Sequence, residues 1–270
     1  REARGQKRAY DREQSGHGQH EPVPPPHQVE PRVGAEAHYE ERTVAESFGG
    51  GTLAARIRAR YQPGVTDVVI VGGGLIGCAA ALRLADRGLR VTVVDRGEPG
   101  REASWAAGGI LAPAVEAHGP GAFVELMRAG VARWRPFAAE LYERAAIDVG
   151  YRDDGTLQLA FDDDEAAALW ARARWQREAG LDVETLAPAQ VARLEPALAP
   201  PTAALRYASG HQIDTRAAVR AVVAACERAG VELVRGEVRR VRHDRRRVLG
   251  VDTDGGPRDA AHVVVAAGAW

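Results

Sequence analysis

The sequence predicts an α/β fold in which a domain built on a parallel sheet is interrupted by an inserted α+β segment. A strand-like run, a glycine-rich turn, an Ala-rich helix and a second strand follow one another within residues 66–95. The alternation then gives way to a long connection of small residues and to mixed helix and strand patterns. A helix and further strand-like runs return over residues 214–270, which predicts re-entry into the first domain.

The composition excludes several classes of partner and mechanism. Lys plus Arg (36) nearly cancels Asp plus Glu (37), so the net charge of -1 predicts no nucleic-acid or anionic-membrane partner. The only Lys is Lys7, which excludes a P-loop or a Schiff-base lysine from the rest of the sequence. No apolar stretch reaches ~18 residues, so we expect no membrane span and a cytoplasmic location. Cys78 and Cys226 are predicted to be small buried residues in a reduced compartment.

Residues 1–64 are expected to be a disordered N-terminal extension. They are rich in Pro, His, Gln and Glu and contain almost no periodic apolar residues. His17, His20 and His27 have neither fixed spacing nor Cys partners, so we expect them to be solvated and predict no metal site. A second glycine run within residues 48–61 lacks a preceding strand, so it is a weak candidate for a phosphate site.

The first globular unit is predicted from residues 67–95. DVVIV at 67–71 is a β-branched apolar run, typical of a central parallel strand that is buried on both faces. The following helix is closed by Gly88, and RVTVVD at 90–95 is a second strand. Together they predict one βαβ unit with a right-handed crossover.

The inserted segment is predicted from two patterns. GTLQLAF at 155–161 alternates like a half-buried strand, and Asp162 or Asp163 caps a helix that runs through Glu178. Before them, residues 122–144 carry apolar side chains at helical spacing, which predicts one apolar helix face. Its members are Phe123, Leu126, Met127, Val131, Trp134, Phe137, Ala138 and Leu141.

The return to the first domain begins with a helix for which Asp214 is the predicted N-cap and Gly230 the end. Three strand-like runs follow at 231–236, 238–244 and 248–254. A turn of Asp254, Gly255 and Gly256 then leads to a last strand at 261–267.

The glycine-rich turn has the spacing of a dinucleotide-binding motif. Gly72, Gly74 and Gly77 give G-x-G-x-x-G between a strand and a helix. In this motif the first glycine allows the tight turn, the second lets the backbone approach a pyrophosphate, and the third lets the helix pack closely. Asp95 ends the second strand 23 positions after Gly72, near the ~20 expected of an acid that accepts from ribose hydroxyls. The pyrophosphate is expected over the helix N-terminus.

The same carboxylate narrows the choice of cofactor. Asp95 would repel a 2′-phosphate, which leaves FAD or NAD. A nicotinamide dehydrogenase would continue the alternation of strands and helices, whereas this sequence continues with a loop of small residues and an α+β insertion. The layout therefore favours FAD.

Several stretches can be compared with a known family. They are the glycine turn with VVDR at 93–96, REASWAAGGILAP at 101–113, DTRAAVRAVVAAC at 214–226 and VVVAAGAW at 263–270. Together they resemble the D-amino-acid oxidase superfamily of flavoproteins over residues 66–270, and EASWAAGGILAP resembles most the glycine oxidases of thiamine biosynthesis. The resemblance implies an FAD-binding Rossmann-like domain with an inserted α+β substrate domain, incomplete at the C-terminus. The predicted boundaries are 65–150 and 214–270 for the two parts of the FAD-binding domain and 151–213 for the substrate-domain segment.

The resemblance also implies a set of cofactor-binding residues. Leu75 and Ile76 are placed at the turn over the pyrophosphate, Asp95 and Arg96 beside the adenosine ribose, and the backbone of Val238 at the adenine edge. Small residues at 106–109 would let backbone N–H groups approach a planar ring that becomes anionic when it is reduced. The remaining implied positions are Ala103 and Ser104 near the phosphate and ribityl region, Gly108, Gly109 and Ile110 along the isoalloxazine, and Gly268 in a late glycine turn.

The implied activity is oxidation of a small amino acid, glycine above all. Members of the family pass a hydride from the carbon next to the amine to FAD, the imine hydrolyses, and oxygen is converted to hydrogen peroxide. An Arg, usually with a Tyr nearby, holds the substrate carboxylate and follows the AAGAW stretch in the family, so no catalytic side chain is assigned. Ile110 stands where Met is common, and we assign no family role to Arg206, Tyr207 or His211.

Two other readings remain open. One is another amine-oxidising flavoenzyme, such as a sarcosine oxidase, which commonly holds its flavin through a Cys, or a D-amino-acid dehydrogenase. The other is a flavin-binding chain that is catalytically incomplete. The expected partners are a small amino-acid substrate, oxygen and, as an open possibility, further copies of the chain in a homo-oligomer.

Overall fold

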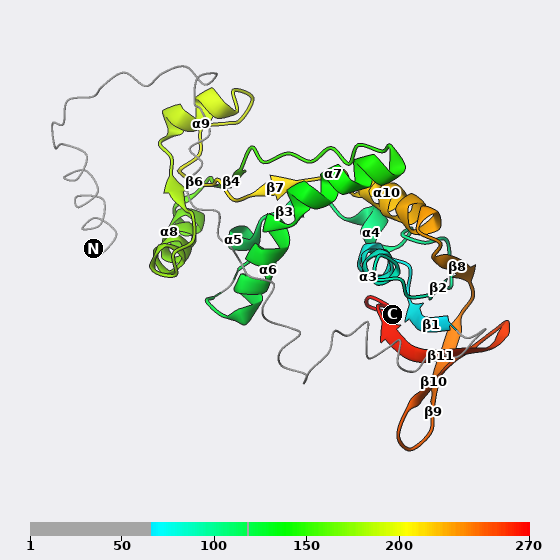
Figure 1. Cartoon of the computed structure of the whole chain (residues 1–270). Coiled ribbons are helices and arrows are strands. Elements are labelled where there is room, and N and C mark those ends of the chain that lie inside the picture. The colour runs from blue at the N-terminus through cyan, green and yellow to red at the C-terminus, as the bar shows by residue number, and fades with distance from the viewer. Residues whose placement is uncertain (1–65, 118) are drawn as a thin grey trace. The chain divides into compact units, whose positions relative to one another are not determined.

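The computed structural model describes residues 66–117 and 119–270, so the predictions for residues 1–64 lie outside the described part (Figure 1). A six-stranded sheet with the order β8-β2-β1-β11-β10-β9 forms the centre of the fold. Its strands are β1 (Thr66–Val71), β2 (Val91–Asp95), β8 (Glu232–Arg235), β9 (Val238–His243), β10 (Val248–Thr253) and β11 (Gly256–Val265).

The middle of this sheet is parallel, as the sequence predicts. β1 pairs in parallel with β2 on one side and with β11 on the other, and β8 extends the parallel part beyond β2. Residues 68–70 are all buried, so β1 is covered on both faces. The pairing of β8 and β11 with the first two strands confirms that residues 214–270 return to the first sheet.

One face of the sheet is covered by α3 (Leu75–Ala85) and α10 (Thr215–Arg228). Their small side chains pack on Val68, Ile70 and Val93 in a single apolar cluster. Both cysteines lie in it, and the Cys226 thiol donates to the Cys78 carbonyl at 3.2 Å. A hydrogen bond to the Cys226 thiol and burial raise the pKa of Cys78, so its thiol stays protonated. The prediction that both are buried residues is confirmed.

The predicted helix ends are also confirmed. Gly88 has φ +75° after α3, and its N–H donates to the Ala85 carbonyl at 2.7 Å. The Asp214 carboxylate accepts from the N–H groups of Arg216 and Ala217 at 2.9 and 3.0 Å. These bonds lower the pKa of Asp214, because they favour the charged carboxylate.

A second, antiparallel sheet has the order β4-β6-β5. α8 (Asp163–Glu178) packs against it, and its N-cap Asp162 accepts from the Glu165 N–H at 2.8 Å. α5 (Pro113–Glu116) packs in one apolar cluster with α8 and this sheet, although it precedes residue 151 in the chain. The predicted domain boundary between residues 150 and 151 stays a prediction. The other elements here are β4 (Thr156–Ala160), β5 (Glu184–Thr185), β6 (Ala203–Tyr207) and α9 (Pro188–Leu194).

The prediction of one apolar helix face over residues 122–144 is wrong. The structure has two helices, α6 (Ala122–Ala132) and α7 (Trp134–Ala145), which meet at Arg133. Pro136 explains the break, because it has no N–H to donate and its ring would clash with the carbonyl four residues earlier in a continuous helix. Phe123 and Leu126 are 69% and 68% exposed, since α6 buries Val124 instead.

The last strand is longer than predicted. β11 begins at Gly256, which pairs with Thr253 of β10, so the turn consists of Asp254 and Gly255 only. The cross-strand pairing continues through Arg258 and Asp259, whose charged side chains hid the strand from a reading based on apolar residues.

Candidate cofactor site

The glycine turn, Gly72–Gly77, lies at the carboxyl end of β1. Gly72 has φ +102°, and a Cβ atom there would lie 2.4 Å from the Ala266 carbonyl oxygen. A Cβ atom on Gly77 would lie 2.0 Å from the Gly72 carbonyl oxygen. Neither position can accept a side chain without movement of the backbone. The tight turn and the close helix packing predicted for these two glycines are therefore present.

The start of α3 offers backbone donors next to this turn. The first bond within the helix runs from the Cys78 N–H to the Gly74 carbonyl at 2.9 Å. The Leu75 N–H donates to the Ser104 hydroxyl at 3.0 Å, and the N–H groups of Ile76 and Gly77 have no carbonyl of the helix before them. These N–H groups and the positive end of the helix dipole favour an anion such as a pyrophosphate.

Asp95 is fixed beside the turn by two backbone donors. Its Oδ2 accepts from the Gly73 N–H at 2.7 Å and its Oδ1 from the Gly97 N–H at 2.8 Å. Each carboxylate oxygen keeps a second lone pair, so the group can still accept from ribose hydroxyls. The Asp95 carbonyl accepts from the Gly236 N–H at 2.7 Å, two residues before the half-buried Val238.

Arg96 and Gly268 are connected through Trp270. The Arg96 guanidinium lies 4.5 Å from the centre of the Trp270 ring and 3.3 Å from a carboxylate oxygen of Glu102. Gly268 has φ +69°, which turns the chain after β11 and brings Trp270 back toward β2.

A second region of the site is the small-residue loop, which we define as Ala107–Leu111. It follows α4 (Ala103–Ala106) and contains β3 (Ile110–Leu111), which pairs antiparallel with β7 (His211–Gln212). Within it, the Gly109 carbonyl accepts from the Ile213 N–H at 2.9 Å.

Gly109 allows this close approach of two backbones. It has φ +80°, and a Cβ atom there would lie 2.0 Å from the Ile213 carbonyl oxygen. The Ala107 carbonyl accepts from the Thr215 hydroxyl at 2.9 Å. The other side of the loop is open, because Ile110 is 64% exposed and a Cβ atom on Gly108 would meet nothing within 4 Å.

The predicted residues therefore form two groups of contacts. Gly72, Gly74, Leu75, Gly77, Asp95 and Ser104 surround the start of α3, and Gly108, Gly109 and Ile110 lie along the small-residue loop. Ile76, which is 80% exposed, and the exposed Ala103 adjoin the first group through their neighbours in the chain. The sequence did not predict the contacts of Ile213 and Thr215 with this loop, because no sequence pattern connects them with residues about a hundred positions earlier.

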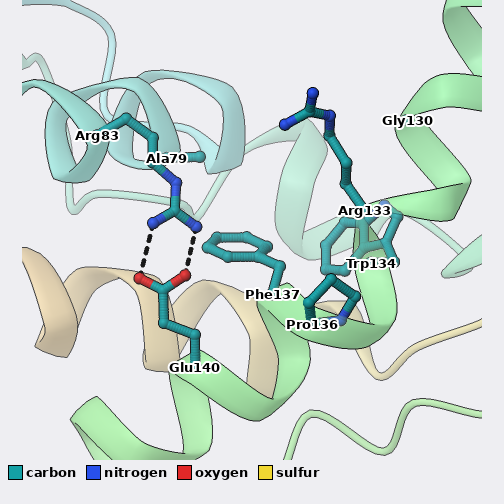
Figure 2. Close-up of a pocket in the computed structure, with 8 residues that line it drawn as sticks. All are labelled: Ala79, Arg83, Gly130, Arg133, Trp134, Pro136, Phe137 and Glu140. Atoms are coloured by element: carbon teal, nitrogen blue, oxygen red, sulfur yellow. Dashed lines mark hydrogen bonds and ion pairs between the residues drawn. The ribbon is translucent and has the colours of Figure 1, made fainter. Parts of the chain in front are cut away.

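A pocket of about 450 Å³ lies elsewhere, between α3 and the α6–α7 junction (Figure 2). In Figure 2, Arg83 and Glu140 point toward one another beside the Phe137 ring, and their charged groups pair at 2.7 and 2.5 Å. This ion pair raises the pKa of Arg83. None of the predicted cofactor residues lines the pocket, whose walls are formed by Ala79, Arg83, Gly130, Arg133, Trp134, Pro136, Phe137 and Glu140.

The geometry of the turn and the loop fits an FAD-binding site, and comparison with known proteins agrees with it. The family model described as FAD dependent oxidoreductase matches residues 67–270. The chain belongs to this FAD dependent oxidoreductase family. Its parallel-sheet core is the FAD-binding fold of that family, and FAD is its cofactor.

Individual members of the family give the extent of the match. Glycine oxidase of Geobacillus kaustophilus is 35% identical over 207 residues, which cover 76% of this chain and 55% of that protein. The crystal structure of glycine oxidase from the same species matches with a TM-score of 0.72 at 34% identity, over 76% of this chain and 56% of that one. The bifunctional protein ThiO/ThiG of Nostoc sp. is 31% identical over 206 residues, which cover 76% of this chain and 31% of that protein. The chain thus spans about half the length of the glycine oxidases that it matches.

Two further predictions concern metal and membrane. Within the residues that the structure describes, no group of three or more His, Cys, Asp and Glu side chains is arranged to hold a metal ion. No helix in the described part is long and apolar enough to cross a bilayer.

Proposed function

We propose that the protein catalyses the oxidative deamination of glycine or of another small amino acid. Bound FAD supplies an acceptor for the hydride that leaves the carbon next to the amine, after which the imine hydrolyses and oxygen is reduced to hydrogen peroxide. The observation that carries the proposal is the small-residue loop. Its backbone is fixed at Gly109 and open at Gly108 and Ile110, in a chain that is 35% identical to a glycine oxidase.

The protein's own residues would orient the cofactor in three places. The N–H groups at the start of α3 would bind the pyrophosphate, and Asp95 would accept from the ribose hydroxyls. The small-residue loop would lie along the isoalloxazine, where backbone N–H groups stabilise negative charge on a reduced ring. Orientation of an amine over the ring then supplies much of the rate, since the hydride must leave in line with its acceptor.

The other proposed contacts follow the resemblance. Arg96 would flank the ribose, and Val238 would meet the adenine edge through its backbone. Ala103 and Ser104 would approach the phosphate and ribityl region, and the Ser104 hydroxyl accepts from the Leu75 N–H at the start of α3. Gly268 would form the late turn of the site. Oxygen as the electron acceptor, a cytoplasmic location, a homo-oligomer and a role in thiazole formation for thiamine belong to the same proposal.

The two cysteines concern the alternative hypothesis of a sarcosine oxidase, which commonly holds its flavin through a Cys. Cys78 and Cys226 are both fully buried in the apolar cluster between the sheet and its helices. Neither of them offers a thiol for a covalent bond to a flavin ring at the small-residue loop. A covalent bond to flavin would therefore have to be made by a residue other than these two, and acid precipitation of the protein from the complete coding sequence tests for such a bond.

The decisive experiment is anaerobic reduction of the flavin by glycine. The protein expressed from its complete coding sequence is purified, and its absorbance near 450 nm is recorded before and after glycine is added without oxygen. Bleaching of the yellow spectrum, followed by peroxide when air is admitted, would support the proposal. An unchanged flavin spectrum with glycine, and with sarcosine and D-alanine as controls, would reject amine oxidation and favour a catalytically incomplete flavin protein.

A further inference from the structure

A side-chain pair lies directly behind the small-residue loop. Tyr151 Oη and His211 Nδ1 are hydrogen-bonded at 2.8 Å, and their rings meet edge to face with centres 5.5 Å apart. The two residues are 60 positions apart, and both are half-buried. Neither residue belongs to the cofactor site described above.

His211 is joined to the small-residue loop through its own backbone. It opens the segment 211–215, which we call the backing segment. His211 and Gln212 of the backing segment pair with Leu111 and Ile110 of the loop. Further along the segment, the Ile213 N–H donates to the Gly109 carbonyl and the Thr215 hydroxyl donates to the Ala107 carbonyl. The backing segment is therefore bonded along the whole length of the loop.

Tyr151 belongs to the strand-like stretch on the opposite side of the backing segment. Arg152 and Gln212 exchange two backbone hydrogen bonds at 3.0 and 2.9 Å, and the Asp214 N–H donates to the Val149 carbonyl at 2.8 Å. The backing segment thus lies between residues 149–152 and the loop. The Tyr151–His211 bond adds a side-chain tie to the three backbone bonds across this junction.

The register shows which face the pair occupies. Residues directly opposite in an antiparallel pair point to the same face, and neighbours alternate. His211 is opposite Leu111, and Leu111 and Tyr151 both pack against the apolar core. Ile110 is opposite Gln212, and both are exposed. The pair therefore supports the loop from the face opposite to that of Ile110.

The charges around the pair favour a neutral imidazole. Burial and the nearby Arg135 lower the pKa of His211, because both disfavour the protonated ring. Arg135 also lies 5.3 Å from the centre of the Tyr151 ring and is ion-paired with Asp153. A neutral His211 with its proton on Nε2 accepts a hydrogen bond from the Tyr151 hydroxyl at Nδ1, and the other tautomer donates to the Tyr151 oxygen; the 2.8 Å distance fits both.

We propose that Tyr151 and His211 are positioning residues for the flavin ring, which act through the backing segment on the small-residue loop. The inference rests on the proposed placement of the ring along Gly108–Ile110. It predicts that the pair affects binding of the flavin half of FAD and leaves binding of the ADP half, at the glycine turn, unchanged.

The test compares FAD with ADP as probes of the apoprotein. The protein from the complete coding sequence is stripped of flavin, and dissociation constants for FAD and for ADP are measured in wild type, Tyr151→Phe and His211→Leu. We expect each substitution to weaken FAD binding about 3- to 10-fold, as for the loss of one hydrogen bond, with ADP binding within about twofold of wild type. The double variant should bind FAD no more weakly than His211→Leu alone, because the two residues act as one unit.

Two further variants separate positioning from general stability. His211→Asn should restore FAD affinity, since its amide oxygen can accept from the Tyr151 hydroxyl. Tyr207→Phe removes a phenol that is hydrogen-bonded to Gln158 of β4 and Gln176 of α8, so it should lower the melting temperature without changing FAD affinity. Equal losses for FAD and ADP, or unchanged FAD affinity in Tyr151→Phe, would overturn the inference. Failure of glycine to reduce the bound flavin would instead remove the proposed substrate and leave this affinity test intact.

Discussion

The glycine turn and the small-residue loop both contain glycines at which a Cβ atom would clash with a backbone carbonyl, yet the side chains that hold the two regions come from very different distances in the chain. The polar contacts of the turn come from Asp95 and Ser104, which lie 22 and 29 positions from their partners. The loop is held by Ile213 and Thr215, and the Thr215 bond spans 108 positions. The side-chain hydrogen bonds of the turn therefore come from nearby in the chain, whereas those of the loop need the chain to return after the whole inserted segment.

The largest expected effect is at the turn, from Gly77→Ala. The new Cβ atom would lie 2.0 Å from the Gly72 carbonyl oxygen, so the helix must move away from the sheet. We expect a loss of about 3 kcal/mol in the free energy of unfolding, with little or no FAD retained after purification. Urea denaturation and the flavin-to-protein absorbance ratio measure the two effects. Gly97→Ala is the matched control, because its Cβ atom would meet only Asp95 Oδ1 at 3.7 Å.

The equivalent change in the loop, Gly109→Ala, should separate the two regions. The strained φ of +80° and the clash with the Ile213 carbonyl oxygen are expected to cost about 1–3 kcal/mol. FAD affinity should fall while ADP affinity is kept, since the turn is untouched. Gly108→Ala, with open space around its Cβ atom in the protein itself, should keep wild-type stability in the flavin-free protein. If Gly109→Ala weakened ADP and FAD binding alike, the two regions would not be independent.

This difference also explains how much could be predicted from the sequence. Gly72, Gly77 and Asp95 were identified because their roles depend on spacing within one βαβ unit, and the structure places them together. Only the family resemblance pointed to the small-residue loop, and nothing in the sequence connected it to Thr215. The helix over 122–144 was predicted as one because apolar spacing hides the effect of a single Pro136.

A smaller effect is expected from Thr215→Val, which changes the residue that donates to the loop from 108 positions away in the chain. This change removes the hydroxyl that donates to the Ala107 carbonyl and keeps the shape of the side chain. We expect a loss of about 0.5–1 kcal/mol, because water can partly replace the donor at this exposed bond. Thr215→Ser keeps the hydroxyl and should retain wild-type stability in the same urea experiment. A stability of Thr215→Val equal to that of the Ser variant would show that the hydroxyl does not hold the loop.

The smallest effect on stability is expected when the pH is lowered, and it arises at the Tyr151–His211 pair. The pKa of His211 in the folded protein is lowered below its ordinary value of 6.5, so the unfolded chain takes up the proton first as pH falls. Stability from the neutral ring is complete above about pH 6.5 and is lost as pH falls through the lowered folded pKa. Unfolding free energies measured between pH 7.5 and 5 should therefore decline more in wild type than in His211→Asn, which cannot titrate. The hydrogen bonds that the described residues make to the glycine turn involve no histidine, so ADP affinity should differ little between the two proteins over this range. Parallel pH profiles of stability in the two proteins would show that His211 does not couple the loop to protonation.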